Sequence, residues 1–240
     1  MTYNIYLGNS LELLKELPNE SIDAIITDPP YGVNYLSSWT NKHHKLVGDE
    51  DEHIDNLYSK FLPEARRLLK PKGVLCSFSG GGGYKPTTAY ATIELIKHFD
   101  LIQTLVWSKG KRDGSFVGLG WKYRPSYEMI LVASKNKDNY NFYPQYSSNV
   151  FVCPPHIPIA ENGDHPTQKP LKVMRWLINN HTKKGDTILD PFMGSGTTGI
   201  ASLQLGRNFI GYEIDSNYFY TAKQRIELEI NQIRLEEVIE

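Results

Sequence analysis

Short apolar runs alternate along this chain with segments whose apolar residues recur at helical spacing. The runs have the length of β-strands and cover residues 4–7, 22–27, 74–78, 101–107, 127–133, 187–189 and 209–212. The segments between several of them predict helices over residues 57–69, 87–98, 171–181, 197–205 and 217–233. This alternation is typical of an α/β fold, in which helices cover both faces of a mostly parallel sheet.

Three stretches show neither period: residues 33–52, 110–125 and 136–167. Long irregular segments in a compact domain are usually functional loops or disordered segments. The polar residues 70–73 also predict a turn, between a helix and the next strand. Because 240 residues suit one domain with a sizeable core, we expect a single domain over residues 1–240 with the three stretches as loop insertions.

Charge and cysteine content narrow the classes of function. Lysine and arginine total 26 against 27 aspartate and glutamate, so no overall basic field draws the protein to nucleic acid, and DNA contact would need a local patch. The two cysteines, Cys76 and Cys153, indicate neither a disulfide framework nor a zinc site. The histidines His43, His44 and His53 have no partner spacing that fits a closed metal site, so we expect no metal.

The N-terminal ten residues lack a basic region followed by an apolar core, which is the pattern of a secretion signal. No apolar stretch of the sequence approaches the roughly 18 residues of a membrane-spanning helix. We therefore expect a cytoplasmic protein without membrane contact.

A glycine-rich turn, Asp190-Pro-Phe-Met-Gly194-Ser-Gly-Thr-Thr198, follows the apolar run at residues 187–189. In an open α/β sheet, ligands bind beyond the carboxyl ends of the strands, where glycine lets the backbone approach them closely. The turn lacks the Gly-Lys-Ser/Thr ending of a phosphate loop. Glu213 ends the next strand, where a carboxylate can accept hydrogen bonds from both ribose hydroxyls of an adenosine-type ligand. Asp215 is better placed to cap the helix that follows.

A second motif, Asp28-Pro29-Pro30-Tyr31, ends the apolar run at residues 22–27. The Asp28 carboxylate and the Pro29 carbonyl are two hydrogen-bond acceptors on a backbone that proline makes rigid. Such a pair can align an amine whose lone pair is delocalised into a ring, and Tyr31 can stack on that ring. Without the other motif, the segment could equally be a strand-ending turn.

Together, and in this order, the two motifs resemble the β class of S-adenosylmethionine-dependent DNA amino methyltransferases. The segment His165-Pro-Thr-Gln-Lys-Pro170 is similar to the motif that precedes the first helix of this family, and the resemblance covers residues 4–215. It implies a Rossmann-like methyltransferase fold, with a seven-stranded sheet in which residues 127–133 form the one antiparallel strand. It also implies S-adenosylmethionine as cofactor and a target base flipped out of double-stranded DNA.

The resemblance assigns roles to individual residues. The catalytic residues would be Asp28, Pro29, Pro30 and Tyr31, with Asp28 first an orienter of the amine and second a base. The cofactor contacts would be Asn9, Asp28, Thr167, Lys169, Asp190, Phe192, Gly194, Ser195, Gly196, Thr197 and Glu213. Of these, Lys169 and Thr167 would meet the methionine carboxylate, and Asn9 would lie near the adenine ring or serve only as a turn residue. The DNA contacts would be Lys109, Lys111, Arg112, Lys122 and Arg124.

The methylated atom is expected to be adenine N6, because family members with aspartate at the head of the catalytic motif tend to methylate adenine, and cytosine N4 enzymes more often have serine there. Cytosine N4 methylation, an RNA substrate and a catalytically idle domain that binds nucleic acid or a partner remain alternatives. Residues 136–167 would form a short target-recognition region. A restriction endonuclease counterpart, and a monomer or a homodimer, are compatible with the resemblance.

Overall fold

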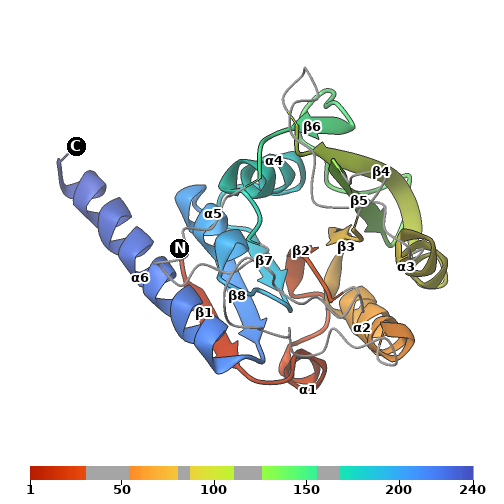
Figure 1. Cartoon of the computed structure of the whole chain (residues 1–240), viewed down its shortest axis with the longest axis horizontal. Helices are drawn as coiled ribbons and strands as arrows, with labels where there is room; N and C mark the ends of the chain where they lie inside the picture. The colour runs from red at the N-terminus through yellow and green to blue at the C-terminus, as the bar shows by residue number, and fades with distance from the viewer. Residues whose placement is uncertain (31–53, 81–86, 111–125, 156–167, 240) are drawn as a thin grey trace.

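A computed structural model describes residues 1–30, 54–80, 87–110, 126–155 and 168–239. In these ranges eight strands form one sheet, in the order β1-β8-β7-β2-β3-β5-β4-β6 (Figure 1). The strands are β1 (Tyr3–Leu7), β2 (Ile22–Thr27), β3 (Leu69–Phe78), β4 (Asp100–Ser108), β5 (Tyr127–Ser134), β6 (Val150–Val152), β7 (Thr187–Asp190) and β8 (Asn208–Glu213). Neighbouring strands are parallel, except that β5 is antiparallel to both β3 and β4.

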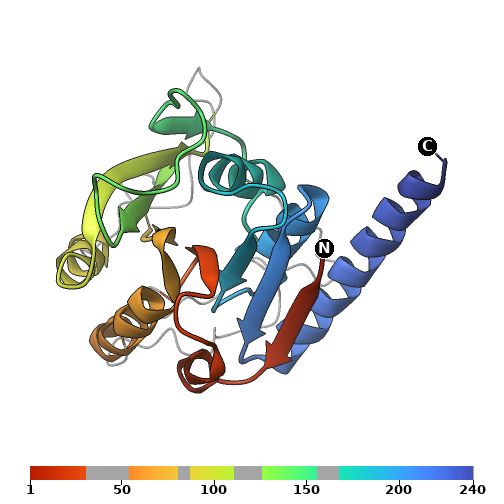
Figure 2. The ribbon, with the colours of Figure 1, turned by 180° about the vertical axis from the view of Figure 1, so that it is seen from behind.

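Helices cover both faces of the sheet (Figures 1 and 2). On one face lie α1 (Ser10–Leu13) with the short 3-10 helix η1 (Leu14–Glu16), α2 (Ile54–Leu68) and α3 (Thr87–Leu95). On the other lie α4 (Leu171–His181), α5 (Thr197–Gln204) and α6 (Ser216–Ile239), and the end of α6 projects beyond the sheet. Within the described ranges, the structure has no helix with the length and apolar character needed to cross a membrane.

Two hydrophobic cores result because successive side chains of a strand point to opposite faces. Ile25 and Leu75 belong to the core under α2 and α3, whereas the adjacent Ile26 and Cys76 belong to the core under α4, α5 and α6. All six residues of β2 are buried and four of them are apolar, which explains why this strand does not show the strict alternation of a strand with one exposed face.

The structure confirms the α/β fold class and the antiparallel strand at β5. The seven predicted strands and five predicted helices are present, with shifts at their ends. The sheet has an eighth strand, β6, within the stretch at residues 136–167 that we expected to be irregular; three residues are too few to show a period. The prediction of a turn at residues 70–73 is wrong, because β3 begins directly after α2 and includes these residues. Over this part of β3 the register against β2 is irregular.

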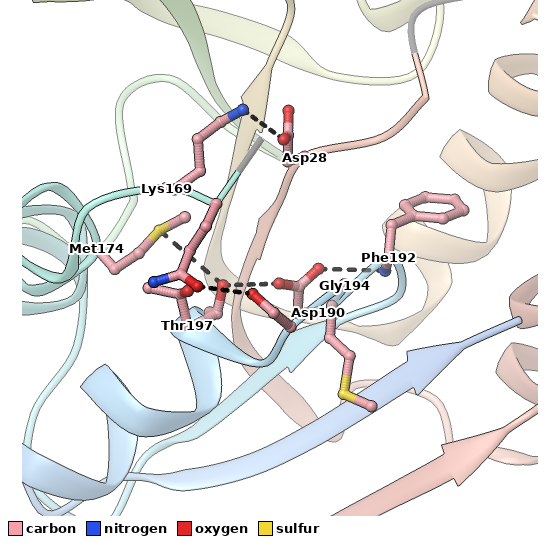
Figure 3. Close-up of a pocket in the computed structure, with 11 residues that line it drawn as sticks. Asp28, Lys169, Met174, Asp190, Phe192, Gly194 and Thr197 are labelled. Atoms are coloured by element: carbon pink, nitrogen blue, oxygen red, sulfur yellow. Dashed lines mark hydrogen bonds and ion pairs between the residues drawn. The ribbon is translucent and has the colours of Figure 1, made fainter. Parts of the chain in front are cut away.

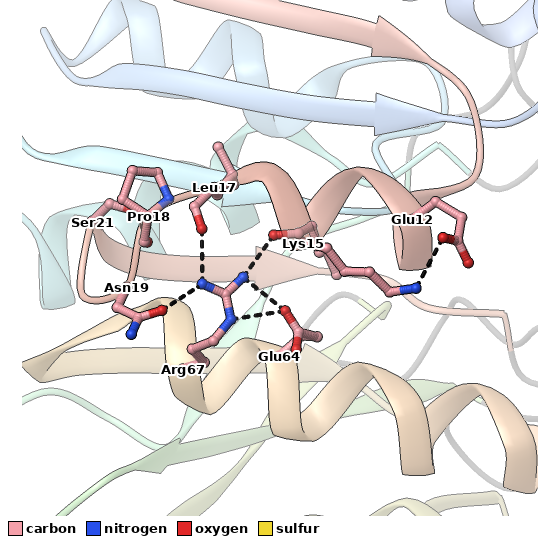
Figure 4. Close-up of polar contacts among 9 residues, drawn as sticks. Glu12, Lys15, Leu17, Pro18, Asn19, Ser21, Glu64 and Arg67 are labelled. Carbon is pink, nitrogen blue, oxygen red and sulfur yellow. Dashed lines mark hydrogen bonds and ion pairs between the residues drawn. The ribbon is translucent and has the colours of Figure 1, made fainter.

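Arg67 on α2 fixes this helix to the segment that connects η1 with β2 (Figure 4). Its guanidinium donates hydrogen bonds of 2.7–2.9 Å to the backbone carbonyls of Leu14 and Leu17, to the side chain of Asn19 and to the carboxylate of Glu64. A planar group with five donors suits so many acceptors in one place. The contact holds the start of β2 against α2.

We expect Arg67→Met to lower the free energy of unfolding by roughly 2–4 kcal/mol, because two carbonyls and a partly buried carboxylate lose a charged donor. Urea denaturation measures this loss. The matched control is Lys15→Met, which removes an exposed pair with Glu12 and should cost less than about 1 kcal/mol. Equal losses in the two variants would contradict the role given to Arg67.

Candidate active site

The two sequence motifs meet at the carboxyl edge of the sheet. β2 and β7 are parallel neighbours, with Ile25 opposite Leu189, so both strands end at the same edge of the sheet. A pocket at this edge has Asp28 on one wall and the glycine-rich turn on another (Figure 3). The predicted site residues that line it are Asp28, Lys169, Asp190, Phe192, Gly194, Ser195 and Thr197.

Asp190 joins the two motifs. Its side chain is 3% exposed, and its Oδ1 accepts a hydrogen bond of 2.8 Å from the hydroxyl of Thr27, the residue before Asp28. Its Oδ2 accepts one of 2.6 Å from Thr198 on α5, and Oδ1 also accepts the Phe192 N–H at 3.2 Å. Asp190 therefore fixes the end of β2, the turn and the start of α5 relative to one another; its predicted cofactor contact stays a prediction.

Burial raises the pKa of Asp190 from its ordinary value of 3.8 to about 6, although the hydrogen bonds from Thr198 and Thr27 oppose this. The folded state then holds a proton that the unfolded state releases, so the stability from this group is present below pH 4 and is lost as pH rises through about 6. We expect wild type to lose roughly 2 kcal/mol more than Asp190→Asn between pH 4 and pH 7. Urea denaturation at both pH values tests this, and parallel losses would contradict it.

The glycine-rich turn has backbone that favours glycine. Gly194 and Gly196 have φ values of 51° and 80°, in the left-handed region. A Cβ on Gly196 would also lie 3.0 Å from the Cβ of Ala222 on α6. The turn is thus packed closely between α6 and the pocket, and Gly196 is the residue from which α5 begins.

Glu213, at the end of β8, holds the glycine-rich turn in place through a hydrogen bond from the turn's backbone. Its Oε2 accepts the Gly194 N–H at 2.9 Å and its Oε1 accepts the Asp215 N–H at 2.8 Å. Burial raises the pKa of the Glu213 carboxyl, and the backbone N–H groups oppose that rise. A carboxylate has about four lone-pair positions, so these contacts leave the expected ribose hydrogen bonds chemically possible.

The two nearby polar residues act as helix caps. Asp215 Oδ1 accepts the N–H groups of Asn217 and Tyr218 at 2.8 and 3.1 Å, which confirms it as the cap of α6. Asn9 caps α1 through the Leu11 N–H at 3.0 Å. Asn9 therefore serves as a turn residue, and its contact with an adenine ring stays a prediction.

Lys169 lies between two carboxylates. It is 7% exposed, and its Nζ is 2.5 Å from Asp28 Oδ2 and 3.1 Å from Glu128 Oε2; Figure 3 shows the Lys169 and Asp28 side chains pointing toward one another. The Nζ of Lys109 is in turn 2.7 Å from Glu128 Oε1. Burial would lower the pKa of Lys169, but Asp28 and Glu128 raise it above its usual range. Burial would raise the pKa of Glu128, but Lys169 and Lys109 hold it below its usual range.

Sequence reasoning missed Glu128. The sequence feature that could have indicated it is a single charged residue at the start of the apolar run at residues 127–133. A carboxylate in that position needs a charged or polar partner once the strand is buried. Several predicted site residues lie outside the described residues: Tyr31, Thr167, Lys111, Arg112, Lys122 and Arg124. The stretches at residues 33–52 and 111–125 also lie outside them, as does the part of the expected target-recognition region at residues 156–167.

Known proteins are similar to this chain in sequence and in fold. Residues 22–224 match the model of the N6/N4 DNA methylase family. The Type II methyltransferase M2.MboI of Moraxella bovis is 29% identical in an alignment that covers 93% of this chain and 87% of the relative. The Type II methyltransferase M.HinfI of Haemophilus influenzae is 30% identical over 92% of this chain and 67% of its own length.

Solved structures give the same picture. The cytosine-N4-specific PvuII DNA methyltransferase aligns with a TM-score of 0.74 over 97% of this chain and 93% of its own, at 19% identity, which shows a shared fold. The M1.HpyAVI complex with S-adenosylmethionine aligns with a TM-score of 0.68 over 94% of this chain and 99% of its own, at 30% identity. The pocket that joins the two motifs is thus set in a known enzyme fold, and the match over residues 22–224 shows that this chain is a DNA methyltransferase of the N6/N4 DNA methylase family.

Proposed function

We propose that this protein transfers a methyl group from S-adenosylmethionine to the N6 amine of an adenine flipped out of double-stranded DNA. The observation that carries the proposal is that Asp28 lines the same pocket as Gly194 and Ser195 of the glycine-rich turn, although these residues are far apart in the sequence. The 30% identical M1.HpyAVI, whose structure is a complex with S-adenosylmethionine, supports this choice of cofactor.

The pocket has features that fit the cofactor. Among the described residues, the buried Oγ1 of Thr197 has no hydrogen-bond partner, and buried hydroxyls seldom remain unpaired. Thr197 lines the pocket at the start of α5, where a bound polar ligand would satisfy it. Glu213 would accept the ribose hydroxyls, and Ser195 and Phe192 would lie against the ligand. When bound, S-adenosylmethionine supplies an electrophilic methyl group.

Asp28 would orient the target amine. An ionised carboxylate only accepts hydrogen bonds, and a lysine ammonium at 2.5 Å favours that ionised and weakly basic form. Asp28 is therefore better suited to hold an amine hydrogen than to remove a proton, and the Pro29 carbonyl would accept the second hydrogen. Alignment of this kind can contribute roughly 7 to 11 kcal/mol to lowering a barrier.

DNA binding would use the basic residues that lie between β4 and β5 in the sequence. Lys109, at the end of β4, is proposed as a phosphate contact together with Lys111, Arg112, Lys122 and Arg124. Flipping a base costs a few kcal/mol, and stacking on Tyr31 would offset part of that cost. Aspartate rather than serine at the head of the motif favours adenine over cytosine.

The product of the reaction tests the proposal. The protein is incubated with unmethylated genomic DNA and isotopically labelled S-adenosylmethionine, and the digested nucleosides are analysed by mass spectrometry. Labelled N6-methyladenine is the expected result, and labelled N4-methylcytosine would keep the enzyme class but replace the target base. Cofactor binding without label on DNA would favour an RNA substrate, a missing partner or a catalytically idle domain.

A further inference from the structure

We infer that Glu128 is a positioning residue for methyl transfer, which holds the Lys169 ammonium where it orients the Asp28 carboxylate. The inference rests on the proposed function, since it takes Asp28 as the group that meets the target amine. Glu128 itself is one ion pair further from that amine and acts through Lys169.

The direction of β5 places Glu128 at the site. Parallel strands of this sheet reach the pocket at their last residues, but β5 is antiparallel and begins there. Its second residue, Glu128, pairs in register with Trp107 near the end of β4. The first residues of β5, including Glu128, therefore lie at the same edge of the sheet as Asp28.

The charges along this path alternate and balance. Lys109, Glu128, Lys169 and Asp28 follow one another at N–O distances of 2.7, 3.1 and 2.5 Å. If Glu128 lost its charge, the two ammonium groups would remain with the single carboxylate of Asp28 among these four residues. Lys169 would then shift toward Asp28 and away from Lys109, and it would turn the carboxylate with it.

Aromatic rings lie beside the two ammonium groups of this path. Lys169 Nζ lies 5.2 Å from the ring centroid of Phe78, and Lys109 Nζ lies 5.3 Å from that of Trp107. Both rings are almost completely buried and pack edge to face, 6.5 Å apart. Charges beside such rings are poorly screened, so a change of charge at Glu128 acts on Lys169 and through it on Asp28.

The variant Glu128→Gln keeps the shape of the side chain and removes its charge. We expect the single-turnover rate of methyl transfer, at saturating DNA and S-adenosylmethionine, to fall by up to about 100-fold, because a small displacement of an aligning group has effects of this size. The dissociation constant of S-adenosylmethionine, measured by calorimetry, should stay within about twofold of wild type. Glu128→Asp keeps the charge and should restore part of the rate.

The matched control is Asp23→Asn, which also removes a carboxylate that is buried and paired with a lysine. Asp23 is 7% exposed and lies 2.8 Å from Lys70, but it is near the start of β2, at the edge opposite the pocket. This variant should lose stability and keep the wild-type rate. It separates the effect of losing any buried ion pair from an effect on Asp28.

A Glu128→Gln rate equal to that of Asp23→Asn would overturn the inference. A loss of cofactor affinity in step with the rate would also overturn it, because Glu128 would then belong to the cofactor site. If the Gln variant does not fold, Glu128→Asp decides: a reduced rate with unchanged cofactor affinity supports the inference, and a wild-type rate contradicts it. Wild-type protein that transfers no methyl group to DNA would overturn the proposed function first, which distinguishes the two failures.

Discussion

Asp28→Ala should reduce methyl transfer to DNA by at least about 1000-fold, because the amine would lose the carboxylate that aligns it. The loss should appear in the rate rather than in binding of S-adenosylmethionine, since the glycine-rich turn and Glu213 are unchanged. The buried Lys169 would still have Glu128 at 3.1 Å, so the variant should fold. A methyl-transfer assay and calorimetry on the same preparation measure the two quantities.

Asp28→Asn is the informative comparison. Asparagine keeps one acceptor oxygen but loses the charge that Lys169 contacts, so its rate should lie between those of wild type and the alanine variant. Wild-type activity in Asp28→Ala would contradict the proposed mechanism. A parallel loss of cofactor binding would instead make Asp28 chiefly a cofactor contact.

Glu213→Ala should weaken binding of S-adenosylmethionine by roughly 100-fold, or about 3 kcal/mol. Two effects add here: the ribose hydroxyls lose a charged acceptor, and the Gly194 N–H that Glu213 holds at 2.9 Å becomes unpaired. The second effect loosens the turn itself. Calorimetric titration with the cofactor gives the change directly.

Asp215→Ala is a suitable control because Asp215 is an acidic residue two positions away on the same edge. It caps α6, so its loss should cost about 0.5–2 kcal/mol of stability and leave cofactor affinity near wild type. Equal affinities for Glu213→Ala and wild type would show that the ribose is bound elsewhere.

The sequence predicts the layers of the fold well because the central strands β2, β3, β5 and β7 are largely buried, and because α2 and α4 have a clear apolar face. β2 is the best case, since all six of its residues are buried and Ala24, Ile25 and Ile26 form an apolar run. β6 and α1 escape prediction because elements of three or four residues have no measurable period; pairing with β4 alone makes β6 a strand. The boundary between α2 and β3 is also hidden, because polar residues at 70–73 have the composition of a turn.

In the candidate site, some residues can also be recognised from the sequence and others cannot. Asp28, Gly194 and Glu213 are recognisable because they stand at strand ends within motifs. The contact of Lys169 with Asp28 and Glu128 cannot be recognised in the sequence, because it depends on three segments that are adjacent only in space. Asp190 looks like a ligand contact in the sequence, and the structure shows that its oxygens are bound by Thr27 and Thr198.

The pairing of β2 with β7 also has a consequence for folding. Thr27 and Asp190, which hydrogen bond across these strands, are 163 residues apart, so the pocket forms only after a contact of very long range. On the ribosome, β2 can pair with β3 early, but its other edge stays open until β7 has been synthesised. An apolar strand with an open edge is a site of aggregation. We therefore expect a chain interrupted before β7 to be inactive and prone to aggregate, although it already contains Asp28.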